Sequence, residues 1–187
     1  WQKQFYTATQ NAVICIGGRG SGKTTAADVT MLVEAVLYPD YYCICPAPTL
    51  KQSRDNFKKI KQLIRGTLYE KRFEVKFLSH PELTIQITAW HNGKSYISEI
   101  KFYTVTNYET FRGIEADRIY ADQAELFDNI IDGTSNVFTT LVACLRGFVP
   151  SVGRDRIAKS WWIANASHNF GMYKLRDRAL DEPDKYL

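Results

Sequence analysis

Long apolar runs are missing from this 187-residue chain. A helix that crosses a bilayer needs about 20 consecutive apolar residues. No stretch approaches that length, and none has the pattern of a secretory signal. The sequence therefore predicts no membrane span. Because the chain begins at Trp1 rather than at a methionine, we also expect it to be part of a longer protein.

Cysteines with metal-binding spacing are also missing. The 4 cysteines include one Cys-x-Cys pair, Cys43 and Cys45, without the second pair that a zinc site needs. Together with Cys15, these two residues lie in apolar, strand-like runs. We expect buried free thiols in a reducing compartment.

A strong net charge is the third absence. The formal charge of +4 and the 24% of charged residues are typical of a soluble globular protein, and they permit an anionic partner without requiring one. The positive charges are clustered, however. Such a cluster predicts either a solvated helix face or a nucleic-acid contact surface, and the sequence leaves both open. Its members are Lys51, Arg54, Lys58, Lys59, Lys61 and Arg65.

What is present is an alternation of apolar runs and helical patterns, typical of a mostly parallel sheet with helices on its faces. An Asn-Gly turn between two alternating segments adds an antiparallel hairpin over residues 83–105. No repeat or linker interrupts the chain, so we expect one α/β domain over residues 1–187. The expected helices cover residues 23–36, 50–64, a segment through 140–145, and 170–180.

The segment GGRGSGKT matches the Walker A pattern, directly after an apolar strand and before a helix. Glycines let the backbone wrap a phosphate, so that N–H groups and the helix N-terminus point at the anion. Lys23 would reach the β- and γ-phosphates of ATP, and the Thr24 hydroxyl would bind Mg²⁺. The expected nucleotide-binding residues are Gly17, Gly18, Arg19, Gly20, Ser21, Gly22, Lys23, Thr24 and Thr25.

A second acidic residue must hold Mg²⁺ from a neighbouring strand, and Asp122 ends the apolar stretch RIYAD. Ligands of open α/β sheets lie at the carboxyl ends of strands. Asp117 precedes the strand, so we expect it at the opposite edge. The pattern predicts a P-loop NTPase of the additional-strand (ASCE, RecA-like) type, with a mostly parallel central sheet flanked by helices and an antiparallel hairpin extension.

In ATPases of this type a glutamate usually follows the aspartate and activates water, whereas this chain has Gln123. An amide can hold a water molecule but cannot accept its proton, and loss of a general base costs about 10²–10⁴ in rate. Three interpretations remain open. In the first, Gln123 is an engineered substitution for a native glutamate, made to trap a bound nucleotide. Glu125 is the base, although it should point elsewhere if a helix begins there. Or the domain binds ATP without hydrolysing it.

Five stretches of the sequence resemble the ATPase domain of the large terminase subunit of tailed bacteriophages, which is a DNA-packaging motor. They are WQKQF, GGRGSGKT, CPAPTLKQS, TFRGIEADRIYADQAEL and ANASHNFGMY. The resemblance implies that Gln2 reads the adenine base. It makes Arg19 a sensor of the γ-phosphate or a partner of a carboxylate.

The same resemblance makes Arg112 an arginine finger that acts on a neighbouring subunit, with an ordinary surface arginine as the alternative. It places Ser167 and His168 on the turn that couples ATP state to movement, although His168 departs from the small hydroxyl residue usual there. The large departure from the family pattern is Gln123 in place of glutamate.

The resemblance also implies partners. These are double-stranded DNA, further copies of the chain in a homo-oligomeric ring (a pentamer), the capsid portal and the small terminase subunit. The expected location is the host cytoplasm, transiently docked on the procapsid. Terminases carry a C-terminal nuclease with clustered carboxylates, and we expect no DNA cleavage by this chain. The alternatives are a superfamily 2 helicase-like ATPase core and a non-hydrolysing ATP-binding switch module.

Overall fold

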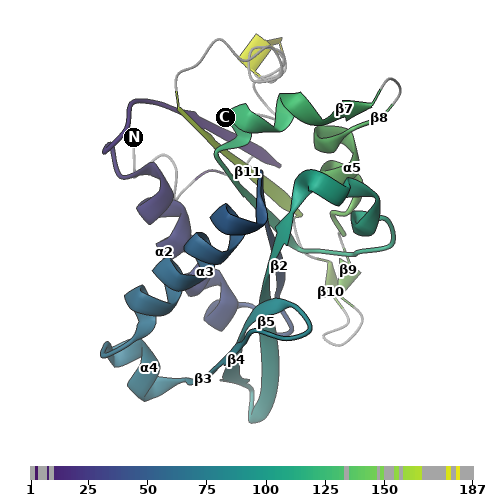
Figure 1. Cartoon of the computed structure of the whole chain (residues 1–187). Helices are drawn as coiled ribbons and strands as arrows, with labels where there is room; N and C mark the ends of the chain where they lie inside the picture. Colours follow the sequence, from purple (N-terminus) through teal and green to yellow (C-terminus); the bar gives the residue numbers. More distant parts are fainter. Residues whose placement is uncertain are drawn as a thin grey trace.

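A central sheet of 7 strands organises the protein (Figure 1). The computed structural model describes residues 3, 8, 11–132, 135–146, 148–149, 154–155, 158–165, 176–177 and 180–181. The strands follow the order β1-β11-β6-β2-β5-β4-β3. Their bounds are β1 Ala12–Ile16, β2 Tyr42–Ala47, β3 Glu74–Leu78, β4 Leu83–His91, β5 Lys94–Thr104, β6 Arg118–Asp122 and β11 Lys159–Ala164.

Helices cover both faces of this sheet. The α-helices are α2 Lys23–Leu37, α3 Leu50–Ile64, α4 Leu68–Arg72 and α5 Val137–Ala143, and two 3-10 helices are η1 Val105–Phe111 and η2 Ala124–Ile130. Figure 1 shows α2, α3 and α4 on one side of the sheet and α5 on the other. Four two-residue strands form two small ribbons, β7 Ile131–Asp132 with β8 Ser135–Asn136 and β9 Phe148–Val149 with β10 Arg154–Asp155.

Strand pairing confirms the predicted fold class. β1, β11, β6, β2 and β5 run parallel, and β4 and β3 extend the sheet antiparallel. Strand β11 pairs with both β1 and β6. It is therefore the additional strand, lying between the strand before the Walker A segment and the strand that ends at Asp122.

Alternation along the central strands divides the core into two layers. Trp161 packs with the cluster beneath α2 and α3, whereas Trp162 packs with the cluster beneath α5. Likewise, Cys43 packs in the first of these clusters and Ile44 in the second. Successive side chains of a strand point to opposite faces, so strands buried on both faces are apolar throughout.

Three predicted helices that the structure describes agree closely with the sequence prediction, whereas α4 was not predicted. α3 has the predicted bounds, α2 ends one residue beyond the predicted end, and α5 ends at Ala143 rather than at 145. The predicted helix over 170–180 lies mostly outside the described residues. Among those described, no helix is long and apolar enough to cross a membrane.

Buried charges hold the amino end of β6. The Asp117 carboxylate is fully buried, accepts a hydrogen bond from the Tyr42 backbone N–H at 2.8 Å, and pairs with Arg146 at 3.2 Å. It lies at the edge of the sheet opposite to Asp122, as predicted. Removing one partner of a buried ion pair is strongly destabilising. We therefore regard Asp117 as a structural residue that helps to fix where β6 begins.

Candidate nucleotide-binding site

The glycine-rich loop between β1 and α2 closes around the Lys23 side chain. Lys23 is buried, and its Nζ donates hydrogen bonds to the carbonyl oxygens of Gly17 at 2.7 Å and Gly18 at 2.8 Å. Gly20 and Gly22 have φ angles of 76° and 80°, a left-handed conformation that favours glycine. The loop can therefore wrap an anion while its lysine lies at the start of α2.

A hydroxyl and a carboxylate meet beside this loop. Thr24 Oγ1 donates a hydrogen bond to Asp122 Oδ1 at 3.2 Å, although the two residues are far apart in sequence. The backbone N–H of Gln123 donates to the same oxygen at 3.0 Å. Burial raises the pKa of the Asp122 carboxyl, while the Thr24 hydroxyl opposes that rise and nearby Glu125 adds to it. Oxygen ligands that share a partly buried negative charge suit a hard divalent cation such as Mg²⁺.

Gln123 leaves the strand in a left-handed conformation, with φ of 55°. Its side-chain oxygen accepts a hydrogen bond from Nε2 of Gln52, in the first turn of α3. The Thr49 hydroxyl in turn donates to Gln52 Oε1 at 2.7 Å and caps the helix by accepting from the Gln52 backbone N–H at 3.3 Å. The end of β6 and the start of α3 are therefore joined by a short chain of hydrogen bonds.

The cap at Thr49 gives a stability prediction. Replacing Thr49 with alanine should lower the free energy of unfolding by about 1 kcal/mol, because a first-turn N–H of α3 loses its acceptor. For a chain of this size the melting temperature should fall by about 2–4 °C. Thr49→Ser keeps the hydroxyl and serves as the control in thermal and urea unfolding. Equal losses in both variants would show that the methyl group, and not the cap, stabilises the helix.

Glu125 lies in the same site, which differs from the sequence expectation. We expected it to point elsewhere if a helix began after Asp122. A 3-10 helix does begin at Ala124, yet Glu125 lines the site, is buried, and accepts a hydrogen bond from Asn165 Nδ2 at 2.8 Å. The left-handed Gln123 redirects the chain before the helix, and this turn brings Glu125 back toward the end of β11.

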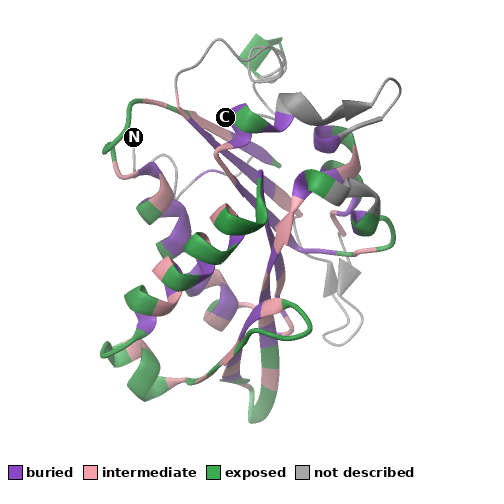
Figure 2. Cartoon of the chain, in the orientation of Figure 1, coloured by how far each residue is buried: buried purple, intermediate pink, exposed green. Residues whose placement is uncertain are grey.

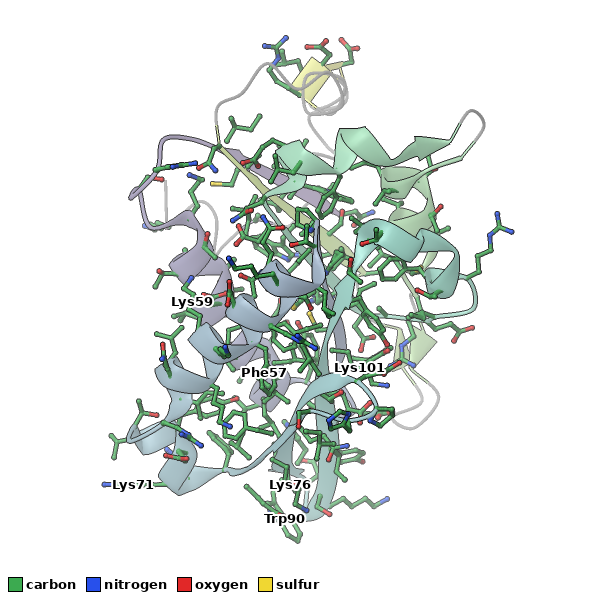
Figure 3. The ribbon with its side chains drawn as sticks, in the orientation of Figure 1. Phe57, Lys59, Lys71, Lys76, Trp90 and Lys101 are labelled. Carbon is green, nitrogen blue, oxygen red and sulfur yellow. The ribbon has the colours of Figure 1, made fainter. Side chains whose placement is uncertain are left out.

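An open cavity of about 540 Å³ lies at the carboxyl edge of the parallel strands, lined by residues 19–25 of the loop and by Asp122, Gln123, Glu125 and Asn165. Lys59 of α3 also lines it and pairs with Asp28 of α2 at 2.7 Å. Burial raises the pKa of the Asp28 carboxyl, and the Lys59 ammonium opposes that rise. Figure 3 shows Lys59 on the helical layer beside the sheet. The cavity therefore combines a cationic wall with a carboxylate wall.

A larger cavity, of about 670 Å³, lies away from this loop. Its lining includes Glu82, Glu99 and Lys101, and Lys101 pairs with Glu82 at 3.1 Å. Figure 3 shows Lys101 well separated from Lys59. Carboxylates outnumber cations along its wall, so it does not suit the phosphates of a nucleotide.

The other predicted site residues divide into two groups. Arg19 and Thr25 are exposed and line the nucleotide cavity, whereas Arg112 is exposed and does not line it. Gln2, Ser167 and His168 lie outside the described residues. Sequence reasoning assigned no site role to Gln52, Lys59 and Asn165. Gln52 and Asn165 both fall within stretches that carried the resemblance, and Lys59 belongs to the basic cluster.

No protein-family model and no curated protein sequence matches the chain. Solved structures do match. The ADP complex of the large terminase from a thermophilic bacteriophage aligns with 100% of this chain and 44% of its own at a TM-score of 0.68 and 17% identity. The HK97 bacteriophage large terminase aligns with 100% of this chain and 37% of its own, at a TM-score of 0.70 and 13% identity.

The Thermus phage P74-26 large terminase ATPase domain aligns with 99% of this chain and 90% of its own, at a TM-score of 0.59 and 17% identity. The chain thus spans less than half of the longer terminases but most of an isolated ATPase domain. At sequence identities this low, the comparisons establish a shared backbone arrangement alone. The chain has the P-loop ATPase fold of phage large terminases.

Proposed function

We propose that this chain is the ATPase domain of a DNA-packaging motor, which binds Mg-ATP and uses its hydrolysis to drive double-stranded DNA into a viral capsid. The observation that supports this most directly is the site itself. A Walker A loop, its buried Lys23 and the Thr24–Asp122 contact lie in the sheet order of an additional-strand ATPase. Solved structures with the same fold include phage large terminases, and one of these was solved with ADP and with ATP-gamma-S.

The residues of the cavity fit a magnesium nucleotide. Lys23 and the loop N–H groups would hold the phosphates, and Thr24 with Asp122 would hold Mg²⁺, whose charge would offset the negative charge on the β- and γ-phosphates. Lys23 donates to two loop carbonyls and to Ser21 Oγ at 3.3 Å, so its ammonium is held within the loop. All three of its N–H groups are engaged, and a phosphate oxygen would take the place of at least one of these acceptors.

Hydrolysis in this chain should be impaired, because Gln123 occupies the position of the general base. Its amide oxygen can hold a water molecule, but it cannot take the proton that the attacking water must lose. The hydrogen bond from Gln52 orients this side chain. Glu125 is the second candidate for the base, favoured by its burial in the same cavity and its contact with Asn165.

A second function, a non-hydrolysing ATP-binding switch, is favoured by the same amide at Gln123. The motor requires more than one copy of the chain, arranged as a homo-oligomeric ring. In such a ring Arg112, which is exposed outside its own cavity, would act on the phosphates bound by a neighbour. The further partners of this proposal are the capsid portal and the small terminase subunit, and its location is a procapsid in the host cytoplasm.

DNA-dependent ATP hydrolysis by the Gln123→Glu chain tests the function. We expect linear duplex DNA to stimulate phosphate release several-fold at protein concentrations that permit assembly, and single-stranded DNA of equal length to stimulate it less. Stimulation by single strands alone would favour the helicase alternative. Tight nucleotide binding, with a hydrolysis rate that neither form of DNA increases, would favour the switch.

A further inference from the structure

The basic cluster noted in the sequence separates into paired and unpaired charges on α3 and at Arg65, the residue directly after its last turn. Lys59 pairs with Asp28, and the Lys61 ammonium lies 4.9 Å from the centre of the Phe77 ring. The other four are exposed and form no ion pair within the described part of the chain. These four residues, which we call the α3 basic stripe, are Lys51, Arg54, Lys58 and Arg65.

The spacing of the stripe places it along one side of the helix. Its members follow at intervals of three, four and seven residues, and residues so spaced share a helix face. The residues on the opposite side of the helix are buried, namely Ser53, Phe57, Ile60 and Ile64. Figure 2 shows the exposed face of α3 turned outward from the sheet. A helix anchored through its apolar face can present these charges in a fixed arrangement.

The outer face of α3 keeps a positive charge after its own acidic residue is counted. Asp55 is exposed on the same side, four residues after Lys51 and three before Lys58, so it can offset part of the repulsion that Arg54 meets from these two lysines. One carboxylate against four cations leaves the stripe with a net charge of about +3, which suits a polyanionic partner. A helix of this length spans about 22 Å, along which duplex DNA presents roughly a dozen phosphate charges.

The same helix begins at the nucleotide site. Gln52 in its first turn donates to Gln123, and Lys59 lines the cavity. A partner bound along α3 would therefore contact the helix that is hydrogen-bonded, through Gln52, to the end of β6. We propose that the α3 basic stripe binds the phosphate backbone of double-stranded DNA. This inference rests on the proposed function, and it assigns to that function a surface that contacts DNA.

Paired charge removals test the stripe. In the Arg54→Gln/Lys58→Gln chain, affinity for a short linear duplex should fall roughly tenfold for each charge at about 0.1 M salt. The slope of log affinity against log salt should become shallower by about 0.9 per charge. The matched control is Lys71→Gln/Arg72→Gln, which removes one lysine and one arginine from exposed positions on α4. Figure 3 shows that Lys71 points away from the position of Lys59.

Nucleotide affinity is measured on all three chains and should stay unchanged. A selective loss of DNA binding in the stripe variant supports the inference. Equal losses in both variants, or none in the stripe variant, would overturn it while the unaltered chain still binds duplex DNA. If the unaltered chain does not bind duplex DNA even at low salt, then the proposed packaging function itself fails.

Discussion

Replacing Gln123 with glutamate should accelerate single-turnover ATP hydrolysis at least about a hundredfold, with little change in nucleotide affinity. The new carboxylate would have nearly the shape of the amide, so it should keep the hydrogen bond from Gln52 Nε2. Unlike the amide, it can accept a proton from water. Phosphate release from a pre-bound nucleotide measures the rate, and fluorescence titration measures the affinity.

Glu125→Gln is the informative companion variant, because Glu125 lines the same cavity. If Gln123 occupies the base position, then Glu125→Gln should change the slow rate of the unaltered chain only slightly. If Glu125 is the base, its amide variant should lose the remaining hydrolysis, and Gln123→Glu should bring little gain. Equally slow turnover in every variant would remove both carboxylate positions from consideration and favour the switch function.

Replacing Lys23 with alanine should weaken ATP binding by a factor of about a hundred or more. Truncating one partner of a buried, hydrogen-bonded charge pair costs about 2–5 kcal/mol, and each 1.4 kcal/mol corresponds to a factor of about ten in affinity. Lys23 is suited to such a pair, because its ammonium is buried among loop carbonyls beside the cavity. Lys23→Arg should also bind ATP more weakly, because a planar guanidinium does not replace a compact ammonium.

Isothermal titration with Mg-ATP checks this prediction. Lys76→Ala removes an equal charge from an exposed site on β3, where Lys76 pairs with Glu74 at 2.8 Å, so it should bind ATP like the unaltered chain. A loss of less than threefold in Lys23→Ala would contradict phosphate binding by this loop. Thermal unfolding of both variants separates a lost contact from a lost fold.

Local patterns were sufficient for much of the architecture. The period of the apolar positions predicted α3 to its terminal residues, and the Asn-Gly turn predicted the β4–β5 hairpin. These features depend on neighbours in sequence, where helix and turn preferences act directly. The Walker A loop was found for the same reason, since a phosphate cradle needs glycines, a lysine and a threonine in one continuous segment.

The surroundings of Gln123 could not be predicted from the sequence. Glu125 was expected to point away because a helix should follow Asp122, and the left-handed turn at Gln123 could not be read from an ordinary glutamine. Gln52 and Asn165 belong to segments far from residues 122–125, and their contacts exist only because of the strand order.

The sequence by itself therefore determined the class of fold, the phosphate loop and the position of Asp122, because each follows from short-range pattern and residue chemistry. The tertiary structure decided that Lys59 and Glu125 enter the same cavity and that four of the α3 charges form no ion pair in the described part of the chain. The first outcome follows from the strand order, because β2, which leads into α3, and β11 both lie beside β6. The second follows from packing, because α3 buries its apolar side and leaves these charges exposed.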